Sequence, residues 1–230
     1  MTLKLGVPSK GRLKDGTFQW FGERGVTLSL AGTYREYSGS VKGVPGVELV
    51  LMSAGEIPRE LQGGRIHLGV TGSDLVRESL LHWRTETEEV AQLGFGHAEL
   101  VVAVPRCWID VDTLDDLDDV ASAFRQVHGR RLRIATKYHR LVREFLKENG
   151  VADYLLVDSQ GATEGTVRNQ TAEAIADLVS TGETLQANGL KILSNGVIHR
   201  SQATLFQSRQ AGWGTSEMAI LKDLRTRLGS

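Results

Sequence analysis

The sequence predicts an α/β fold with parallel sheets. Short apolar runs of strand length alternate with amphipathic segments of helix length along the chain. Repeated strand, turn and helix units are typical of parallel sheets with right-handed crossovers, and such sheets bind ligands beyond the carboxyl ends of their strands. The turns in which we therefore expect the binding residues are residues 9–12, 71–74, 137–140, 159–164 and 180–184.

Composition narrows the functional classes. The chain has 230 residues, 40% of them hydrophobic, which is enough for one large or two small domains. Its net charge of −1 lacks the basic field that nucleic-acid binding requires. No stretch approaches the ~20 apolar residues of a membrane span, no export signal opens the chain, and the single Cys107 fits a reducing cytoplasm. We expect a soluble cytoplasmic protein that binds neither nucleic acid nor membranes.

Two common kinds of catalytic site lack candidates. The six histidines form no HxH or HExxH pair, so no transition-metal site built from side chains is expected. There is no GxSxG motif, and Cys107 has no evident base beside it, so nucleophilic catalysis has no candidate either.

The first strand is expected over Leu3 to Val7. It leads through a basic turn into a helical pattern, so Lys10, Gly11 and Arg12 would lie where a helix start favours anions. The alternative is a solvated basic turn without function.

Further strands are expected over Val26 to Leu30 and Val47 to Met52. The glycine-rich stretch between them suggests a mobile hairpin or flap, which would make Arg35 a cation on a movable element. An ordinary surface arginine is the alternative.

Arg65 to Val70 reads as a strand that ends in a turn with hydroxyl groups. We expect Thr71, Gly72 and Ser73 to offer amides and hydroxyls to a ligand, and Asp74 to cap the next helix.

The next two units carry one charged candidate each. A strand over Leu132 to Thr136 leads into a helix start at Lys137, which adds a cation. A strand over Tyr154 to Val157 leads into the loop that holds Glu164, a ribose or metal contact or simply a surface residue.

The most informative stretch runs from Glu173 to Gly189. A buried strand over Ala174 to Val179 is followed by a small turn and a short helix that Gly189 can end. Such a turn leaves backbone N–H groups unpaired at the positive end of a helix, which is a cradle for phosphate. The residues expected to form it are Ser180, Thr181, Gly182, Glu183 (by its backbone) and Thr184.

Asp177 separates this turn from a generic anion site. A carboxylate repels phosphate but accepts hydrogen bonds from sugar hydroxyls. The turn and the Asp177 carboxylate together therefore match a ribose phosphate. The alternative is that Asp177 caps a turn and the loop is only a tight connection. Together the five turns suit a ligand with several phosphates and a sugar.

In this order the pieces resemble the short form of ATP phosphoribosyltransferase, over about residues 3–206. Its most specific part is Glu164 followed by AEAIADLVSTGETLQANGL, which is similar to the family signature. The segments that recur in the family's order are SKGRL, LGVTGSDLV, LGFGHAELVVAVP and IATKYHRLVREFL.

The resemblance implies a two-lobed fold like that of periplasmic binding proteins, with a cleft between two α/β domains. The first domain would be residues 1–94 completed by 190–230, and the second residues 95–189. It also implies transfer of 5-phosphoribosyl from phosphoribosyl pyrophosphate to N1 of the adenine of ATP, with Mg²⁺ and release of pyrophosphate. A separate regulatory subunit resembling histidyl-tRNA synthetase is expected, in a hetero-octamer.

The expected roles follow from charge. The turn after Asp177 would bind the 5-phosphate and Asp177 the ribose hydroxyls, while Arg12 and Arg35 would neutralise the leaving pyrophosphate. Lys10 would hold phosphate oxygens. Mg²⁺ would be held mainly by substrate phosphates, because it prefers oxygen ligands and keeps several waters.

The chain departs from the family pattern in several places. Gly165-Thr166-Val167 stands where the family reads close to V-A-P, Gln170 stands at a family glycine, and Met52 to Gly55 replaces a usual arginine. Ala176 precedes Asp177, so the ribose contact rests on one carboxylate. The rival functions are a non-catalytic sensor or solute-binding protein of the same fold and a transferase that uses another base.

Overall fold

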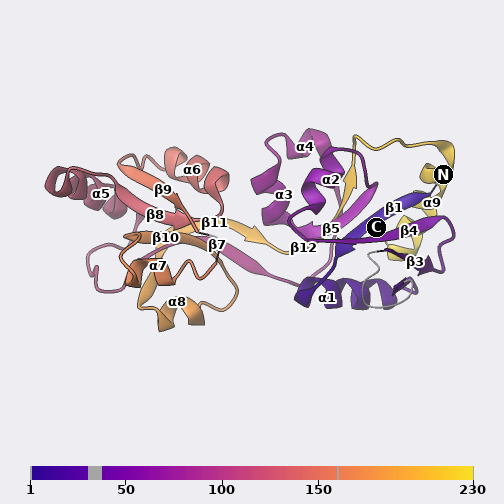
Figure 1. Cartoon of the computed structure of the whole chain (residues 1–230), viewed down its shortest axis with the longest axis horizontal. Coiled ribbons are helices and arrows are strands. Elements are labelled where there is room, and N and C mark those ends of the chain that lie inside the picture. Colours follow the sequence, from indigo (N-terminus) through magenta and orange to yellow (C-terminus); the bar gives the residue numbers. More distant parts are fainter. Residues whose placement is uncertain (1, 31–37, 160, 230) are drawn as a thin grey trace. The chain divides into compact units, whose positions relative to one another are not determined.

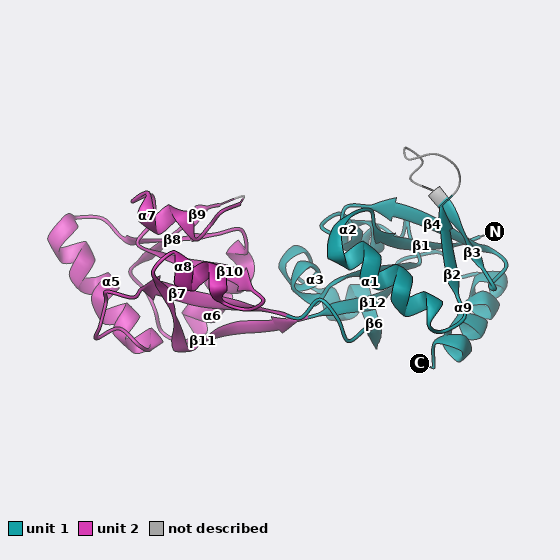
Figure 2. Ribbon diagram, turned by 90° about the horizontal axis from the view of Figure 1, so that it is seen from below, with its two compact units in different colours: residues 1–97, 202–230 teal, residues 98–201 magenta. Residues whose placement is uncertain are grey.

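The computed structural model describes residues 2–30, 38–159 and 161–229. The chain divides into two compact units, residues 1–97 with 202–230 (unit 1) and residues 98–201 (unit 2), as Figure 2 shows. Each unit has its own sheet with helices packed on it. None of the helices in these ranges is long and apolar enough to cross a membrane.

Unit 1 is built on a sheet with the strand order β2-β3-β4-β1-β5-β12-β6. Its central strands β4, β1 and β5 are parallel, and every other pairing in this sheet is antiparallel. The strands are β1 (Leu3–Pro8), β2 (Thr27–Leu30), β3 (Ser38–Lys42), β4 (Val47–Met52), β5 (Leu68–Gly72), β6 (Thr87–Gln92) and β12 (Ala203–Ser208). The helices are α1 (Gly11–Gly22), α2 (Ile57–Gln62), α3 (Ser73–Ser79), α4 (Trp83–Glu86) and α9 (Thr215–Leu228).

Helices cover both faces of the unit 1 sheet (Figure 1). Phe21 of α1 and Leu224 of α9 belong to one buried cluster with the central strands. Ile57 of α2 and Val76 of α3 pack with Phe206 in a second cluster. Because β1 and β5 are buried by both layers, their near-continuous apolar runs were visible in the sequence.

Unit 2 has a sheet with the strand order β11-β7-β10-β8-β9. Strands β10, β8 and β9 are parallel, whereas β7 pairs antiparallel with both β10 and β11. Its strands are β7 (Ala98–Pro105), β8 (Leu132–Thr136), β9 (Tyr154–Asp158), β10 (Ala174–Val179) and β11 (Leu190–Ser201). Its helices are α5 (Leu114–His128), α6 (His139–Glu148), α7 (Gly165–Arg168) and α8 (Glu183–Ala187).

The α/β class is confirmed, but the expectation of parallel sheets holds only for β4, β1 and β5 and for β10, β8 and β9. Both sheets are mixed, because β7, β11 and β12 run against their neighbours. An apolar run buried on both faces has the same composition in either direction, so the sequence pattern does not contain strand direction. The strand expected over Arg65 to Val70 is also displaced, since β5 begins at Leu68 and continues to Gly72.

Glu173 clamps the amino ends of β8 and β10. Its Oε2 accepts from the Arg133 backbone N–H at 2.8 Å, and its Oε1 accepts from Arg133 Nη2 at 2.7 Å and from Arg130 Nη2 at 3.3 Å. Burial raises the pKa of the Glu173 carboxyl, but the hydrogen bonds from Arg133 and Arg130 outweigh it and hold the pKa below its ordinary value of 4.5. The ionised carboxylate therefore favours the folded state.

We expect the Glu173→Gln substitution to reduce the loss of stability in acid. A carboxyl whose folded pKa is depressed stabilises the protein above its unfolded pKa, and this contribution is lost as pH falls through the folded pKa. The free energy of unfolding of the variant should therefore be lower than that of the wild type at pH 7 by about 1–3 kcal/mol. Urea denaturation between pH 7 and pH 3 measures the free energy of unfolding of the wild type and of the variant. If the difference between them does not shrink toward pH 3, the ionised Glu173 carboxylate is not what stabilises the fold.

Gln170, which stands at a glycine of the family pattern, has a left-handed backbone conformation. Its φ is +57°, a left-handed value that favours glycine, and its carbonyl accepts from Arg133 Nη2 at 2.9 Å. The turn after α7 therefore carries a side chain at a strained backbone position.

Restoring glycine should stabilise the protein. We expect Gln170→Gly to raise the free energy of unfolding by about 0.5–1 kcal/mol, because relief of the left-handed strain exceeds the added freedom of the unfolded chain. The matched control is Gln126→Gly in the last turn of α5, where glycine should lower stability, by up to about 1 kcal/mol. Urea denaturation of both variants checks this, and a loss of stability at position 170 would show that the side chain matters more than the strain.

Candidate active site

Three of the expected turns lie at one edge of the unit 2 sheet. Because β10, β8 and β9 are parallel neighbours, their carboxyl ends meet at the same edge (Figure 1). The turns that follow these strands are residues 180–184, 137–140 and 159–164. The structure thus brings together the phosphate turn, one cation and the acidic loop within a single unit.

The turn after β10 leaves its backbone donors unused. Strand β10 ends at Val179 as expected, and α8 begins at Glu183 with Gly182 as its N-cap at φ +79°. The N-cap makes no side-chain hydrogen bond. Among the described hydrogen bonds of turns and loops, none has an amide of residues 180–184 as its donor. Ser180, Thr181 and Thr184 are exposed with hydroxyls that make no described contact.

Asp177 lies in β10 opposite Val101 of β7. By strand alternation it shares a face with Ile175 and Val179, which belong to the cluster under Leu185 of α8. Its Oδ1 accepts from the Leu178 backbone N–H at 2.8 Å. The half-buried carboxylate is thus held beside the helix that carries the turn, with its other oxygen left for a ligand.

Lys137 and Glu164 flank this edge with different exposures. Lys137 is exposed, and its Nζ lies 5.2 Å from the ring centroid of Tyr138. Glu164 is half-buried at the N-cap of α7 and makes no side-chain cap hydrogen bond. Both charged groups are available at the edge.

A contact between His139 and Asp158 was missed by sequence reasoning. Nε2 of His139 lies 3.2 Å from Oδ1 of Asp158, and because the carboxylate can only accept, the imidazole donates. The contact ties the start of α6 to the end of β9. The signal available in the sequence was that Asp158 ends a strand and that His139 lies three residues after one, but their pairing depends on β8 and β9 being neighbours.

In unit 1, β1 and β5 are parallel neighbours, so their following turns lie at one edge of that sheet. Helix α1 begins at Gly11, which has φ +73°, and Lys10 is its N-cap without a side-chain hydrogen bond. Lys10 and Arg12 are exposed and form no ion pair with any described residue. Two free cations therefore stand at the amino end of a 12-residue helix.

The turn after β5 is buried. Gly72 and Thr71 pair with β12, and the Thr71 hydroxyl donates to the carbonyl of Ala54 at 2.8 Å. Ser73 is 7% exposed and starts α3. Burial and pairing favour a supporting role for this turn. The expectation that Asp74 caps α3 is wrong, because the N-cap is Gly72 and Asp74 lies inside the first turn.

Arg35, which was expected to be a cation on a movable element, lies outside the described residues. In the described ranges, no three His, Cys, Asp or Glu side chains gather in a way that could hold a metal ion.

Two solved structures are similar to the chain and indicate its fold class. The chain is similar to a probable amino-acid ABC transporter extracellular-binding protein from Bacillus subtilis, with a TM-score of 0.51 and 11% identity over all of the chain and 91% of that protein. It is more similar to an ATP phosphoribosyl transferase (HisG:HisZ) complex from Thermotoga maritima, with a TM-score of 0.74 and 19% identity over 99% of the chain and 96% of that chain. The fold is thus the mixed α/β fold that periplasmic binding proteins share.

The family follows from the sequence comparisons. The model of the family described as "HisG: ATP phosphoribosyltransferase" matches residues 53–230. An ATP phosphoribosyltransferase of Cereibacter sphaeroides is 73% identical over 93% of the chain and 90% of that protein. The chain belongs to the ATP phosphoribosyltransferase family, which is a family of pentosyltransferases.

Proposed function

We propose that the chain transfers 5-phosphoribosyl from phosphoribosyl pyrophosphate to N1 of the adenine of ATP, the first step of histidine biosynthesis. Membership of the family supports the reaction. The observation that carries the site is the turn at residues 180–184, whose amides and hydroxyls are free beside the carboxylate of Asp177. Phosphate donors next to a hydroxyl acceptor match a sugar phosphate.

The unit 2 edge would hold the sugar donor. Amides of residues 180–184 and the hydroxyls of Ser180, Thr181 and Thr184 would bind the 5-phosphate, and Asp177 would accept from the ribose hydroxyls. Lys137 adds positive charge at the same edge, and Glu164 offers a second hydroxyl acceptor. Adenine N1 is a weak nucleophile, so fixing the sugar in line with it is a large part of the catalytic effect.

The unit 1 edge would hold phosphate oxygens. Arg12 and Lys10 are exposed at the start of α1, where the helix also favours anions. We assign Arg12, with Arg35, to the charge that develops on the leaving pyrophosphate, and Lys10 to oxygens of ATP or pyrophosphate. Gly11 lets the backbone turn at this point, and the turn from Thr71 to Ser73 would support it. No covalent intermediate is required, since electrostatic stabilisation lowers the barrier directly.

Mg²⁺ fits this arrangement as an ion carried by the substrate. The free groups at the unit 2 edge include hard oxygen ligands, namely the carboxylates of Asp177 and Glu164 and three hydroxyls. Mg²⁺ prefers such ligands, keeps several waters and commonly binds through substrate phosphates. When bound it supplies positive charge to the diphosphate.

We also propose a partner and a compartment. The similar Thermotoga maritima structure is a HisG:HisZ complex. By analogy the chain would act with a regulatory subunit resembling histidyl-tRNA synthetase, in a hetero-octamer. A reducing cytoplasm suits the exposed free thiol of Cys107.

Release of pyrophosphate tests the proposed reaction. The chain is mixed with ATP, phosphoribosyl pyrophosphate and Mg²⁺, alone and with the regulatory subunit, and free pyrophosphate and the ribosylated nucleotide are measured. We expect both products in equal amounts. Absence of release in both mixtures would instead indicate a sensor, and release with free adenine but not with ATP would indicate another base.

A further inference from the structure

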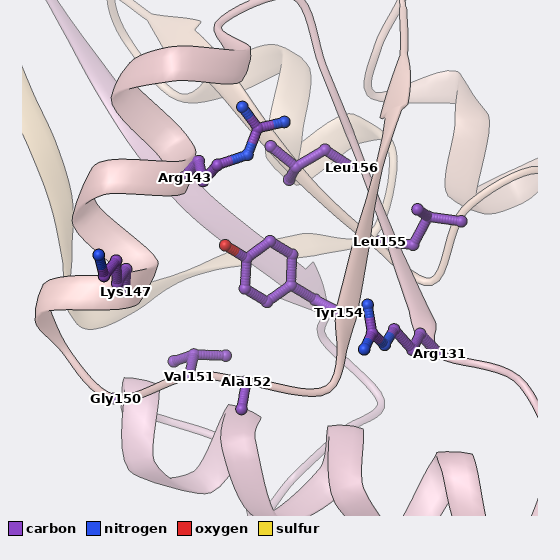
Figure 3. Close-up of a pocket in the computed structure, with 9 residues that line it drawn as sticks. All are labelled: Arg131, Arg143, Lys147, Gly150, Val151, Ala152, Tyr154, Leu155 and Leu156. Carbon is purple, nitrogen blue, oxygen red and sulfur yellow. The ribbon is translucent and has the colours of Figure 1, made fainter.

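A pocket in unit 2 lies away from the candidate active site. It has a volume of about 560 Å³ and is formed by α6, the loop after it, β9 and Arg131 just before β8 (Figure 3). Tyr154, which lines it, precedes Asp158 by four residues, so about 13 Å of strand separates the pocket from the carboxyl edge of the sheet. The pocket is therefore distinct from the turns that we assign to the substrates.

The charge in this pocket is of one sign. Arg143, Lys147 and Arg131 line it, and no Asp or Glu does so. Arg143 and Lys147 lie one turn apart on the same face of α6, and neither side chain makes an ion pair or hydrogen bond with a described residue. The Nε of Arg131 lies 4.0 Å from the carboxylate of Asp153, which also pairs with Arg125. Two cations are thus uncompensated at the rim.

Tyr154 gives the pocket both a ring and a hydrogen-bond donor. Figure 3 shows the ring beside β9 with its hydroxyl directed toward α6, where Arg143 and Lys147 lie. The hydroxyl has no hydrogen bond to any described residue. Burial raises the pKa of Tyr154 although Arg143 opposes it, so the hydroxyl stays protonated and can donate. The side chains of Val151 and Leu156 add apolar surface nearby.

We propose that this pocket binds a small organic anion that carries a phosphate group on a ring. Arg143, Lys147 and the Tyr154 hydroxyl would donate to the phosphate, and the Tyr154 ring with Val151 would contact the ring of the ligand. Cations that are pre-placed around a hollow suit a compact anion, and the volume lies in the range of small-molecule sites.

The test is a titration of the full chain with phenyl phosphate, followed by ¹H–¹⁵N NMR. The amides of Gly150 and Ala152 report on the pocket, whereas those of Gly182 and Glu183 report on the phosphate turn. We expect saturable shifts at Gly150 and Ala152, with a weaker response to inorganic phosphate, which lacks the ring. Shifts confined to the turn would overturn the pocket and leave the proposed reaction intact.

Variants distinguish binding of the anion in the pocket from its attraction by the net charge of the protein. Replacing both α6 cations, as Arg143→Gln with Lys147→Gln, should weaken binding at the pocket about tenfold or more, and Tyr154→Phe about threefold. The matched control replaces two exposed cations elsewhere, Arg59→Gln with Arg106→Gln, and should change the Kd less than twofold. Equal weakening in the control and the pocket variant would identify screening of net charge and overturn the proposal. Because Arg143 and Lys147 are exposed, the double variant is expected to fold, which far-ultraviolet circular dichroism checks.

Discussion

The Arg12→Met substitution is expected to lower kcat/KM by about 100-fold. Arg12 lies in the first turn of α1, exposed and without an ion pair among the described residues. If it meets charge that develops on the leaving pyrophosphate, its contribution is larger in the transition state than in the substrate complex. Removing one such donor typically costs about 3 kcal/mol of transition-state stabilisation. Steady-state kinetics of pyrophosphate release measures the effect, which should fall mainly on kcat.

Lys14→Met is the matched control for Arg12. Lys14 is on the same helix, and its Nζ lies 5.7 Å from the ring centroid of Phe18. Methionine keeps the length of the side chain and the apolar contact but removes the charge. We expect less than a threefold change, since a surface charge outside the site acts only through screened attraction. A comparable loss in both variants, or a loss in Arg12→Met confined to KM, would remove Arg12 from the transition state.

The Asp177→Asn substitution is expected to weaken binding of phosphoribosyl pyrophosphate by about 10- to 100-fold and of ATP by less than about twofold. Asparagine has nearly the same shape, but it exchanges one carboxylate oxygen for an NH2 group, which donates and cannot accept from a ribose hydroxyl. Hydrogen bonds to charged groups contribute about 1.5–3 kcal/mol each, which gives the expected range. Isothermal titration calorimetry with each substrate separates the two effects.

The Glu183→Gln substitution, in the turn after Asp177, is expected not to weaken binding of phosphoribosyl pyrophosphate. Its side chain is exposed, and only its backbone amide is assigned to the phosphate. Losing its negative charge should leave binding of phosphoribosyl pyrophosphate unchanged or slightly tighter, because a phosphate is repelled by a nearby carboxylate. If Asp177 acted only through its charge, Asp177→Asn would likewise tighten binding. Weaker binding in Asp177→Asn together with unchanged binding in Glu183→Gln is thus the signature of a hydroxyl acceptor.

Much of the unit 2 edge was predictable from local sequence. The strands over Ala174 to Val179 and Leu132 to Thr136 have the bounds expected from their apolar runs. The turn at residues 180–184 was visible because its small and hydroxyl-bearing residues cannot continue a buried strand. Which turns lie beside it along the edge was not in the local sequence, because this depends on the parallel pairing of β10, β8 and β9.

Other features could not be predicted because they depend on distant segments. Thr71 and Ser73 have the same residue types as the turn after β10, yet β12 pairs beside them and buries both. Gln170 stands at a family glycine, but only the structure shows that its backbone is left-handed. The contact of His139 with Asp158 joins residues that are 19 positions apart.

The sequence by itself determined the bounds of several strands, β8 and β10 among them, and the chemical groups that follow them, because hydrophobic periodicity and turn preferences act over a few residues. Only the tertiary structure decided which strands run antiparallel, which polar turns are buried and which unpaired cations surround a hollow such as the one at Tyr154. These outcomes follow from pairing and burial between segments far apart in the chain. The free energy of such contacts cannot be predicted from a short stretch of sequence.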